Sequence, residues 1–81
     1  MNKLKHLTLQ EAKKIREKTK RDPRIENMYV YGNSLQGDYY KVCFIMLDKE
    51  VWFTDELDKE GKFNSMHEMI DDYLTLLSYS I

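Results

Sequence analysis

The stretch YVYGNSLQGDYYKVCFIML, residues 29–47, decides the fold. Its two ends are rich in β-branched and aromatic side chains, and the segment GNSLQG between them has the composition of a turn. This pattern predicts two antiparallel strands, residues 25–31 and 38–47. A tight turn at Asp48-Lys49 and a shorter strand over residues 50–54 follow, so the middle of the chain is predicted to form a three-stranded meander.

A helix is predicted on each side of this meander. Thr8 and Glu11 form a capping box, and the helix over residues 9–20 that follows it ends at the chain's only proline. Ser65 and Glu68 form a second capping box. The apolar residues of the second helix recur at helical spacing, namely Met66, Met69, Ile70, Tyr73, Leu74, Leu77 and Ile81. The order α-β-β-β-α predicts a two-layer sandwich of the α+β class.

The length and composition predict one soluble domain. The chain has 81 residues, of which 42% are hydrophobic and 33% charged, as is typical of an ordered globular protein. Its only cysteine, Cys43, has no partner for an intramolecular disulfide, and no apolar run approaches the roughly 18 residues that span a membrane. The opening residues MNKLKHLTLQ lack the apolar core of a secretory signal. We therefore expect a single cytoplasmic domain over residues 1–81, with no membrane partner.

Charge is divided unevenly along the chain. Residues 1–24 carry nine basic and three acidic side chains, a net charge of +6, whereas the remainder carries four basic and eleven acidic ones, a net charge of −7. The two parts either neutralise each other across the fold or present a basic patch to an anion. The second case predicts a nucleic-acid-binding module that uses the first helix and its exit. Its contacts would be Lys13, Lys14, Arg16, Lys18, Arg21 and Arg24.

Strand pairing assigns each side chain of the meander to one face of the sheet, because side chains alternate along a strand. We predict that Gly32 pairs with Gly37 and that Leu47 pairs with Glu50. One face is then almost wholly apolar and forms the predicted core. It holds Ile25, Tyr29, Tyr31, Tyr40, Val42, Phe44, Met46, Val51 and Phe53, with Asn27 and Asp38 as its polar exceptions. The other face mixes charged and large apolar side chains, and it holds Glu26, Met28, Val30, Tyr39, Lys41, Cys43, Ile45, Leu47, Glu50, Trp52 and Thr54.

The mixed face is a candidate docking surface, unless the first helix or residues 55–63 cover it. Tryptophan and tyrosine concentrate binding energy at protein interfaces. The predicted partner-binding residues on this face are Tyr39, Ile45 and Trp52. The charged loop that follows adds Asp55, Glu56, Asp58 and Glu60 to the predicted set. A structural homodimer built on the Trp52 face is a further hypothesis.

Signals for catalysis are weak. His67 and Asp71 stand four residues apart on a predicted helix and so share a face, but the second histidine of the corresponding zinc motif is missing. Cys43 lies between apolar neighbours in the middle of a strand, where a thiol behaves as a small hydrophobic group. The three glycines form no phosphate-binding loop. We therefore predict a chain that is not an enzyme and that has no metal and no cofactor.

Two resemblances bear on function. The α-β-β-β-α order resembles that of double-stranded-RNA-binding domains, but that family has a lysine-rich motif at the start of its second helix, where this chain reads NSMHEM (residues 64–69). The size, the tyrosine-rich meander and the acidic second half are similar to those of small phage or mobile-element proteins that inhibit host defence enzymes, including some anti-CRISPR inhibitors. This second resemblance implies a small non-catalytic module that binds and inhibits a partner protein, which is the function we expect first. It also implies that the acidic loop with Asp55, Glu56, Asp58 and Glu60 occupies a basic groove of a partner that itself binds nucleic acid.

Overall fold

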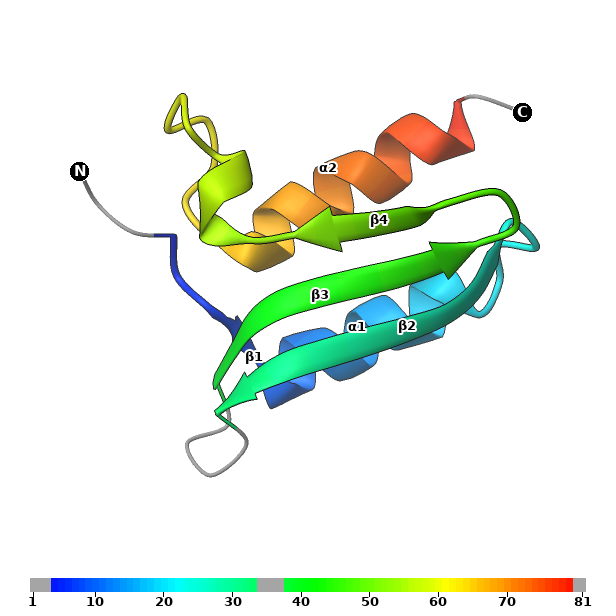
Figure 1. The fold of residues 1–81 in the computed structure, drawn as a ribbon, viewed down its shortest axis with the longest axis horizontal. Coiled ribbons are helices and arrows are strands. Elements are labelled where there is room, and N and C mark those ends of the chain that lie inside the picture. The colour runs from blue at the N-terminus through cyan, green and yellow to red at the C-terminus, as the bar shows by residue number, and fades with distance from the viewer. Residues whose placement is uncertain (1–3, 34–37, 80–81) are drawn as a thin grey trace.

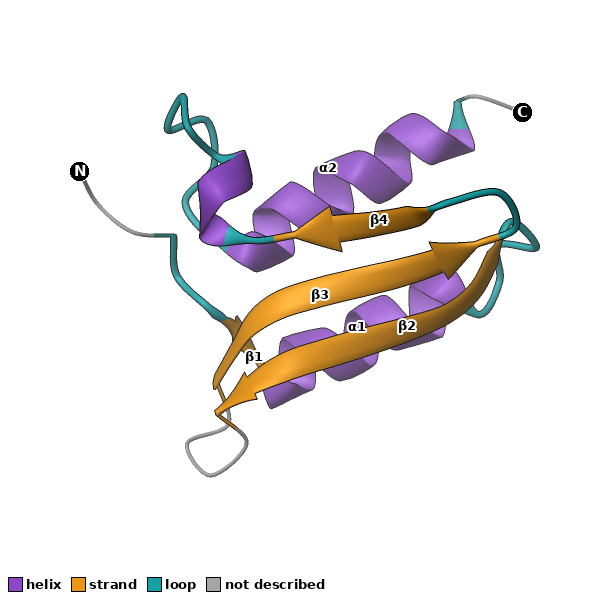
Figure 2. Cartoon of the chain, in the orientation of Figure 1, coloured by secondary structure: helices purple, strands orange, loops and turns teal. Residues whose placement is uncertain are grey.

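The computed structural model describes residues 4–33 and 38–79, and of residues 33, 38 and 39 it describes the backbone alone. Its elements, shown in Figure 2, are β1 (Leu7–Thr8), α1 (Leu9–Thr19), β2 (Ile25–Asn33), β3 (Asp38–Met46), β4 (Glu50–Phe53), the short 3-10 helix η1 (Asp55–Leu57) and α2 (Met66–Ser78). The predicted α+β architecture is confirmed, with both helices and all three predicted strands close to their expected bounds. Gly37 and Ile81, which have predicted places in the hairpin and the second helix, lie outside the described residues.

The fold has two layers, a sheet and a pair of helices that both lie behind it in the view of Figure 1. β3 is the central strand, with β2 on one side and both β1 and β4 on the other, and all pairs are antiparallel. The chain before β1 also pairs, because Lys5 N–H donates to Asn64 O (3.2 Å) and Met66 N–H donates to Lys5 O (3.0 Å). These bonds, which the sequence did not predict, tie the N-terminal segment to the start of α2.

Both helices begin at the predicted caps. At α1, Thr8 N–H donates to Glu11 Oε1 (3.1 Å) and Glu11 N–H donates to Thr8 Oγ1 (3.2 Å). At α2, Glu68 N–H donates to Ser65 Oγ (3.2 Å), whereas the Glu68 carboxylate accepts from Asn64 N–H (3.0 Å), one residue before the cap. These bonds satisfy N–H groups that the first turn of a helix leaves without a partner.

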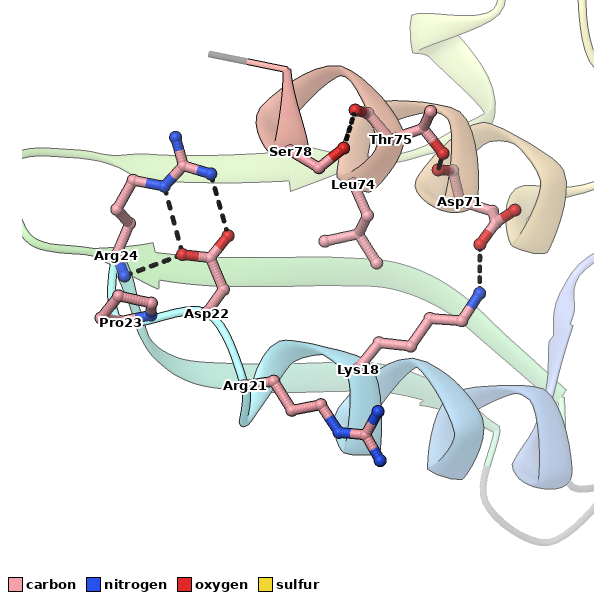
Figure 3. Close-up of a pocket in the computed structure, with 9 residues that line it drawn as sticks. All are labelled: Lys18, Arg21, Asp22, Pro23, Arg24, Asp71, Leu74, Thr75 and Ser78. Carbon is pink, nitrogen blue, oxygen red and sulfur yellow. Dashed lines mark hydrogen bonds and ion pairs between the residues drawn. The ribbon is translucent and has the colours of Figure 1, made fainter. Parts of the chain in front are cut away.

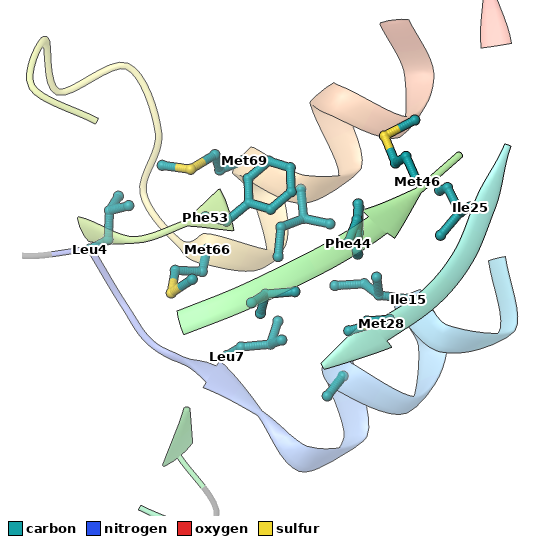
Figure 4. Packing of buried hydrophobic residues seen from close by; sticks show 13 residues of the cluster. Leu4, Leu7, Ile15, Ile25, Met28, Phe44, Met46, Phe53, Met66 and Met69 are labelled. Carbon is teal, nitrogen blue, oxygen red and sulfur yellow. The ribbon is translucent and has the colours of Figure 1, made fainter. Parts of the chain in front are cut away.

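The hydrophobic core fills the space between the two layers (Figure 4). The side chains that water does not reach at all include Leu7, Ile15, Val42, Phe44, Met66 and Ile70, which come from both helices and from the sheet. Phe44 lies near the middle of this cluster, edge-on to Phe53 with their ring centroids 5.2 Å apart. Because both helices contribute to one contiguous cluster, they share one face of the sheet.

The register of β2 differs from the prediction. Gly32 pairs with Tyr39 rather than with Gly37, and irregularities after Ile25 and after Tyr31 each shift the register by one residue. A shift by one residue moves every following side chain to the other face, because side chains alternate along a strand. The prediction for the central part of β2 is therefore inverted.

The inversion changes which aromatic rings belong to the core. Tyr29 pairs with Cys43 and Tyr31 pairs with Lys41, so both rings lie on the face turned away from the helices, and their predicted place in the core is wrong. Met28 takes that place, with 2% of its surface exposed, and Val30 is packed against the core.

The faces of β3 and β4 are as predicted, although the turn between them is not. Met46 N–H donates to Lys49 O (2.8 Å), so the turn residues are Leu47 and Asp48 rather than Asp48 and Lys49. The register therefore moves by two residues, which leaves each side chain on its predicted face. Tyr40 lies on the predicted core face but is not buried. Its surface is 41% exposed, and its ring lies against the imidazole of His6, with ring centroids 4.2 Å apart.

Candidate functional site

The sheet face turned away from the helices carries three large aromatic rings that are only partly buried. Tyr29, Tyr31 and Trp52 keep 44%, 48% and 43% of their surface exposed. They surround Cys43 on the central strand, because Cys43 pairs with Tyr29 on one side and with Trp52 on the other. We call this surface the aromatic sheet face. Its members are Asn27, Tyr29, Tyr31, Lys41, Cys43, Ile45, Glu50 and Trp52.

The rings of this face are held in place by one another and by polar neighbours. Tyr31 stacks on Trp52, with ring centroids 5.7 Å apart and planes 21° apart, and Tyr29 lies 6.4 Å from Tyr31. Trp52 Nε1 donates to Glu50 Oε2 (3.3 Å), and Asn27 Nδ2 donates to the Tyr29 hydroxyl oxygen (3.1 Å). These contacts order side chains that would otherwise lose rotamer freedom on binding, which lowers the entropic cost of an interface.

The thiol at the centre of the face is shielded. Cys43 is only 1% exposed, although its side chain lies on the sheet face turned away from α1 and α2. Burial raises the pKa of the Cys43 thiol above its ordinary value, and the negative charge of Glu50 adds to the effect. A thiol in this state is a poor nucleophile, because the thiolate is the reactive form.

The structure places two of the predicted partner-binding residues on this sheet face. Trp52 is exposed on the predicted face, and Ile45 lies half-buried beside it. Tyr39 belongs to β3 and pairs with both Gly32 and Leu7, but its side chain lies outside the described part of the chain.

Two rings of this face were predicted to lie in the core instead, and one polar residue in the sequence indicated the correct face. Tyr29 and Tyr31 alternate in step with Asn27, a polar residue that is exposed in the structure. Burying a polar side chain without a hydrogen-bond partner is costly. Asn27 therefore indicates that the residues of β2 that alternate with it, Tyr29 and Tyr31, face water. Giving Asn27 that weight would have placed both tyrosines on the open face.

The first helix and residues 55–63 do not cover the aromatic sheet face. α1 packs on the opposite face, where Ile15 belongs to the same buried cluster as Met28. The segment with η1 lies beyond the end of β4, beside the start of α2, as Figure 1 shows. Within residues 4–33 and 38–79, nothing lies across the three rings.

Two of the four predicted acidic contacts are directed toward other groups of the protein itself. Asp58 accepts from the backbone N–H groups of Lys62 (2.7 Å) and Phe63 (3.2 Å), which shapes the loop before α2. Asp55 Oδ1 lies 3.8 Å from His6 Nδ1, and both atoms are buried without a hydrogen-bond partner among the described residues. Glu56 and Glu60 are exposed, but lysines at positions 59 and 62 dilute the charge of the loop. The loop is therefore a weaker acidic surface than its sequence predicts.

The predicted basic surface is divided in a similar way. Arg16 Nη2 donates to the backbone oxygen of Met28 (3.2 Å), and Lys18 forms an ion pair with Asp71. Arg24 binds both carboxylate oxygens of Asp22, each at 3.1 Å, and donates to Leu77 O (2.6 Å). The other three residues of the predicted set are Lys13, Lys14 and Arg21. They are exposed, and the described residues supply no ion-pair partner for them.

An open groove of about 640 Å³ lies between the end of α1 and the second half of α2 (Figure 3). Leu74 and Pro23 supply its apolar lining, the Lys18–Asp71 ion pair bounds one end, and Arg24 with Asp22 bounds the other. The charges along its walls are therefore largely paired within the protein.

The two histidines take part in separate contacts. His67 Nδ1 lies 2.9 Å from Glu11 Oε2, which joins the start of α2 to the first turn of α1. His6, in the segment before β1, faces Asp55, the first residue of η1. Among the described residues, no three His, Cys, Asp or Glu side chains are grouped so as to hold a metal ion.

No known family model, curated protein or solved structure matches this chain. None of the helices in the described part is both long and apolar enough to cross a membrane.

Proposed function

We propose that this chain is a small non-catalytic protein-binding module that docks through the aromatic sheet face. The observation that carries the proposal is the stack of Tyr31 on Trp52, nearly half exposed, on a sheet face that no described element covers. Tryptophan and tyrosine are enriched among the residues that dominate binding energy at interfaces, and the neighbouring Lys41 and Glu50 supply polar contacts at the rim. The shielded state of Cys43 supports the non-catalytic part of the proposal.

The action that we propose for such a module is inhibition of its partner. A protein without catalytic chemistry acts by occupying a surface, so binding would block whatever contact or substrate the partner makes there. An anti-defence role in a phage or mobile element, which the resemblance of size and topology implies, is the specific form of this proposal. We place the protein in the cytoplasm, where a lone reduced cysteine is stable.

Nucleic-acid binding through α1 has less support. Arg16, Lys18 and Arg24 already have partners within the chain, which leaves three of the six predicted cations without such a partner for phosphate contacts. Since each phosphate contact adds to affinity and to its salt dependence, halving the set weakens this alternative considerably.

The proposal is tested by partner capture with matched variants. Tagged protein is used to capture partners from a bacterial lysate, and each purified candidate is then titrated while the fluorescence of Trp52, the chain's only tryptophan, is followed. Tyr31→Thr should weaken binding by about tenfold or more, because it removes one ring of the stack. Tyr79→Thr is the control, since Tyr79 is 82% exposed at the end of α2, away from the face. Equal binding by both variants would refute the proposed docking surface.

A further inference from the structure

We propose that the partner of the aromatic sheet face is a second copy of the same chain, which forms an isologous dimer. This inference rests on the protein-binding role proposed above: it assigns the face to self-association, so that inhibition of another protein through the same face would compete with the dimer. The first argument is charge. The face carries one positive side chain, Lys41, and one negative side chain, Glu50, so it is neutral as a whole and attracts neither a strongly acidic nor a strongly basic partner.

The positions of these two charges fit a two-fold axis. Lys41 lies at one end of the face on β3, and Glu50 lies on β4 opposite Ile45, four residues further along β3. The pair Cys43 and Trp52 lies midway between them. A two-fold axis in the plane of the face, running across the strands through this pair, brings Lys41 of each copy beside Glu50 of the other. One operation therefore forms two equivalent ion pairs, as an isologous interface requires.

The same axis places the aromatic rings against each other. Trp52 of one copy then faces Trp52 of the second copy, and Tyr29 faces Tyr29, because both lie in the row through which the axis passes. Two sheets that pack face to face lie about 10 Å apart with their side chains interdigitated. Each ring would fill the space beside the rings of the other copy, which removes from water the surface that the monomer leaves exposed.

The dimensions of the face set the expected strength of the dimer. β2 and β3 have nine residues each and β4 has four, so the three strands cover roughly 350 Å² in projection. Two such faces bury an area at the low end of specific interfaces, where association is weak and transient. The dimer should therefore appear in the micromolar to millimolar range of concentration.

Sedimentation equilibrium between about 10 µM and 1 mM tests the proposal, because this range brackets the affinity expected for an interface of this size. The mass should rise from 9.8 kDa toward twice that value. Lys41→Glu and Glu50→Lys should each raise the dissociation constant about tenfold, since each places like charges together across the axis. The double variant Lys41→Glu with Glu50→Lys should restore it to within about threefold of the wild-type value, because it exchanges the two signs.

Matched controls come from the loop after η1. Lys59→Glu and Glu60→Lys make the same changes of net charge at exposed positions away from the face, and they should leave the dissociation constant unchanged. Tyr31→Thr gives an independent variant of the face that leaves the Glu50–Trp52 hydrogen bond in place. Thermal melts of all variants establish that each is folded before its mass is compared.

Several results would overturn the dimer. A mass of 9.8 kDa at every concentration would do so, as would a dimer that the single swaps leave intact or that the double swap fails to restore. A monomeric wild-type protein whose Trp52 fluorescence still responds to another purified protein, with loss of that response in Tyr31→Thr, would retain the protein-binding role and reject only self-association. If neither association is found, both proposals fail.

Discussion

The two faces of this sheet are built from the same three strands and hold similar residues, yet their surroundings differ. On the face toward the helices, Val42 and Phe44 are completely buried. On the other face, Tyr31 and Trp52 keep nearly half of their surface in water. Apolar character alone therefore does not determine burial in this protein. Burial is determined by strand register, together with the packing of both helices on one side.

The strongest test of this comparison uses two neighbouring residues of β2. Met28→Asp should lower the free energy of unfolding by at least about 4 kcal/mol, because it removes a packed side chain and buries a carboxyl group without a partner. Tyr29→Asp should cost only about 1 kcal/mol, since that position faces water and loses mainly strand propensity and ring contacts. Urea denaturation measures both values. If the order is reversed, the register of β2 is the one that the sequence first predicted.

A second pair lies on β4. Phe53 is 4% exposed and makes edge contacts with Phe44 and Tyr73, each at 5.2 Å between ring centroids. Phe53→Ala should therefore cost about 3 to 4 kcal/mol, as large-to-small changes in a core do. Trp52→Ala should cost about half as much or less, because its ring is already partly in water. Equal losses in the same urea experiment would mean that Trp52 belongs to a buried layer, and the distinction between the two faces would be lost.

The elements of this fold could be predicted because their signals are local. The capping pairs Thr8 with Glu11 and Ser65 with Glu68 act over three residues, and both helices begin where these pairs place them. The faces of β3 followed from simple alternation for the same reason. Strand β1 was not predicted because it has only two residues and forms only by pairing with β3. Its partner residues lie 30 or more positions away along the chain.

The site could be predicted only in part because it depends on register. The sequence indicates that residues 25–31 form a strand, but it does not reveal the irregularities after Ile25 and Tyr31 that shift the pairing by one residue. Met28 and Val30 are more apolar than Tyr29 and Tyr31, but the tyrosine rings also carry a large apolar surface, and the predicted pairing of Gly32 with Gly37 put these rings in the core. Trp52 was placed correctly because the β4 register moved by an even number of residues.

A third prediction concerns the burial of Cys43 on the open face, where its strand partners are Tyr29 and Trp52. The thiol of Cys43 should react slowly with a chromogenic thiol reagent in the native state, because it is 1% exposed and burial raises its pKa. Trp52→Val should raise this rate by about tenfold, since a smaller side chain uncovers the sulfur. Tyr79→Val, far from the face, should leave it unchanged. The rates are compared over a range of urea concentrations, which separates local access from global unfolding. Equal native-state rates in all three proteins would show that the rings do not shield the thiol.

The smallest effect belongs to the helix layer, where Glu11 of α1 pairs with His67 of α2 (2.9 Å). Burial opposes ionisation of Glu11, but hydrogen bonds from Thr8 and the charge of His67 outweigh it, so the pKa of Glu11 lies below its ordinary value of 4.5. A lowered carboxyl pKa stabilises the folded state above the unfolded pKa, and this stabilisation is lost as the pH falls through the folded pKa. Glu11→Gln keeps an acceptor for Thr8 N–H and removes only the charge.

We therefore expect Glu11→Gln to cost about 0.5 kcal/mol near pH 6, with the difference from wild type disappearing below pH 4.5 as Glu11 becomes protonated. Urea denaturation at a series of pH values measures this difference. Glu17→Gln is the matched control, since Glu17 lies on the same helix with an exposed partner, Lys20, and should change stability very little at any pH. A cost for Glu11→Gln that stays the same at low pH would mean that the negative charge of Glu11 contributes nothing to stability. In that case the two helices would be held on the sheet by their buried apolar side chains, and the pair with His67 would add nothing to the covered face.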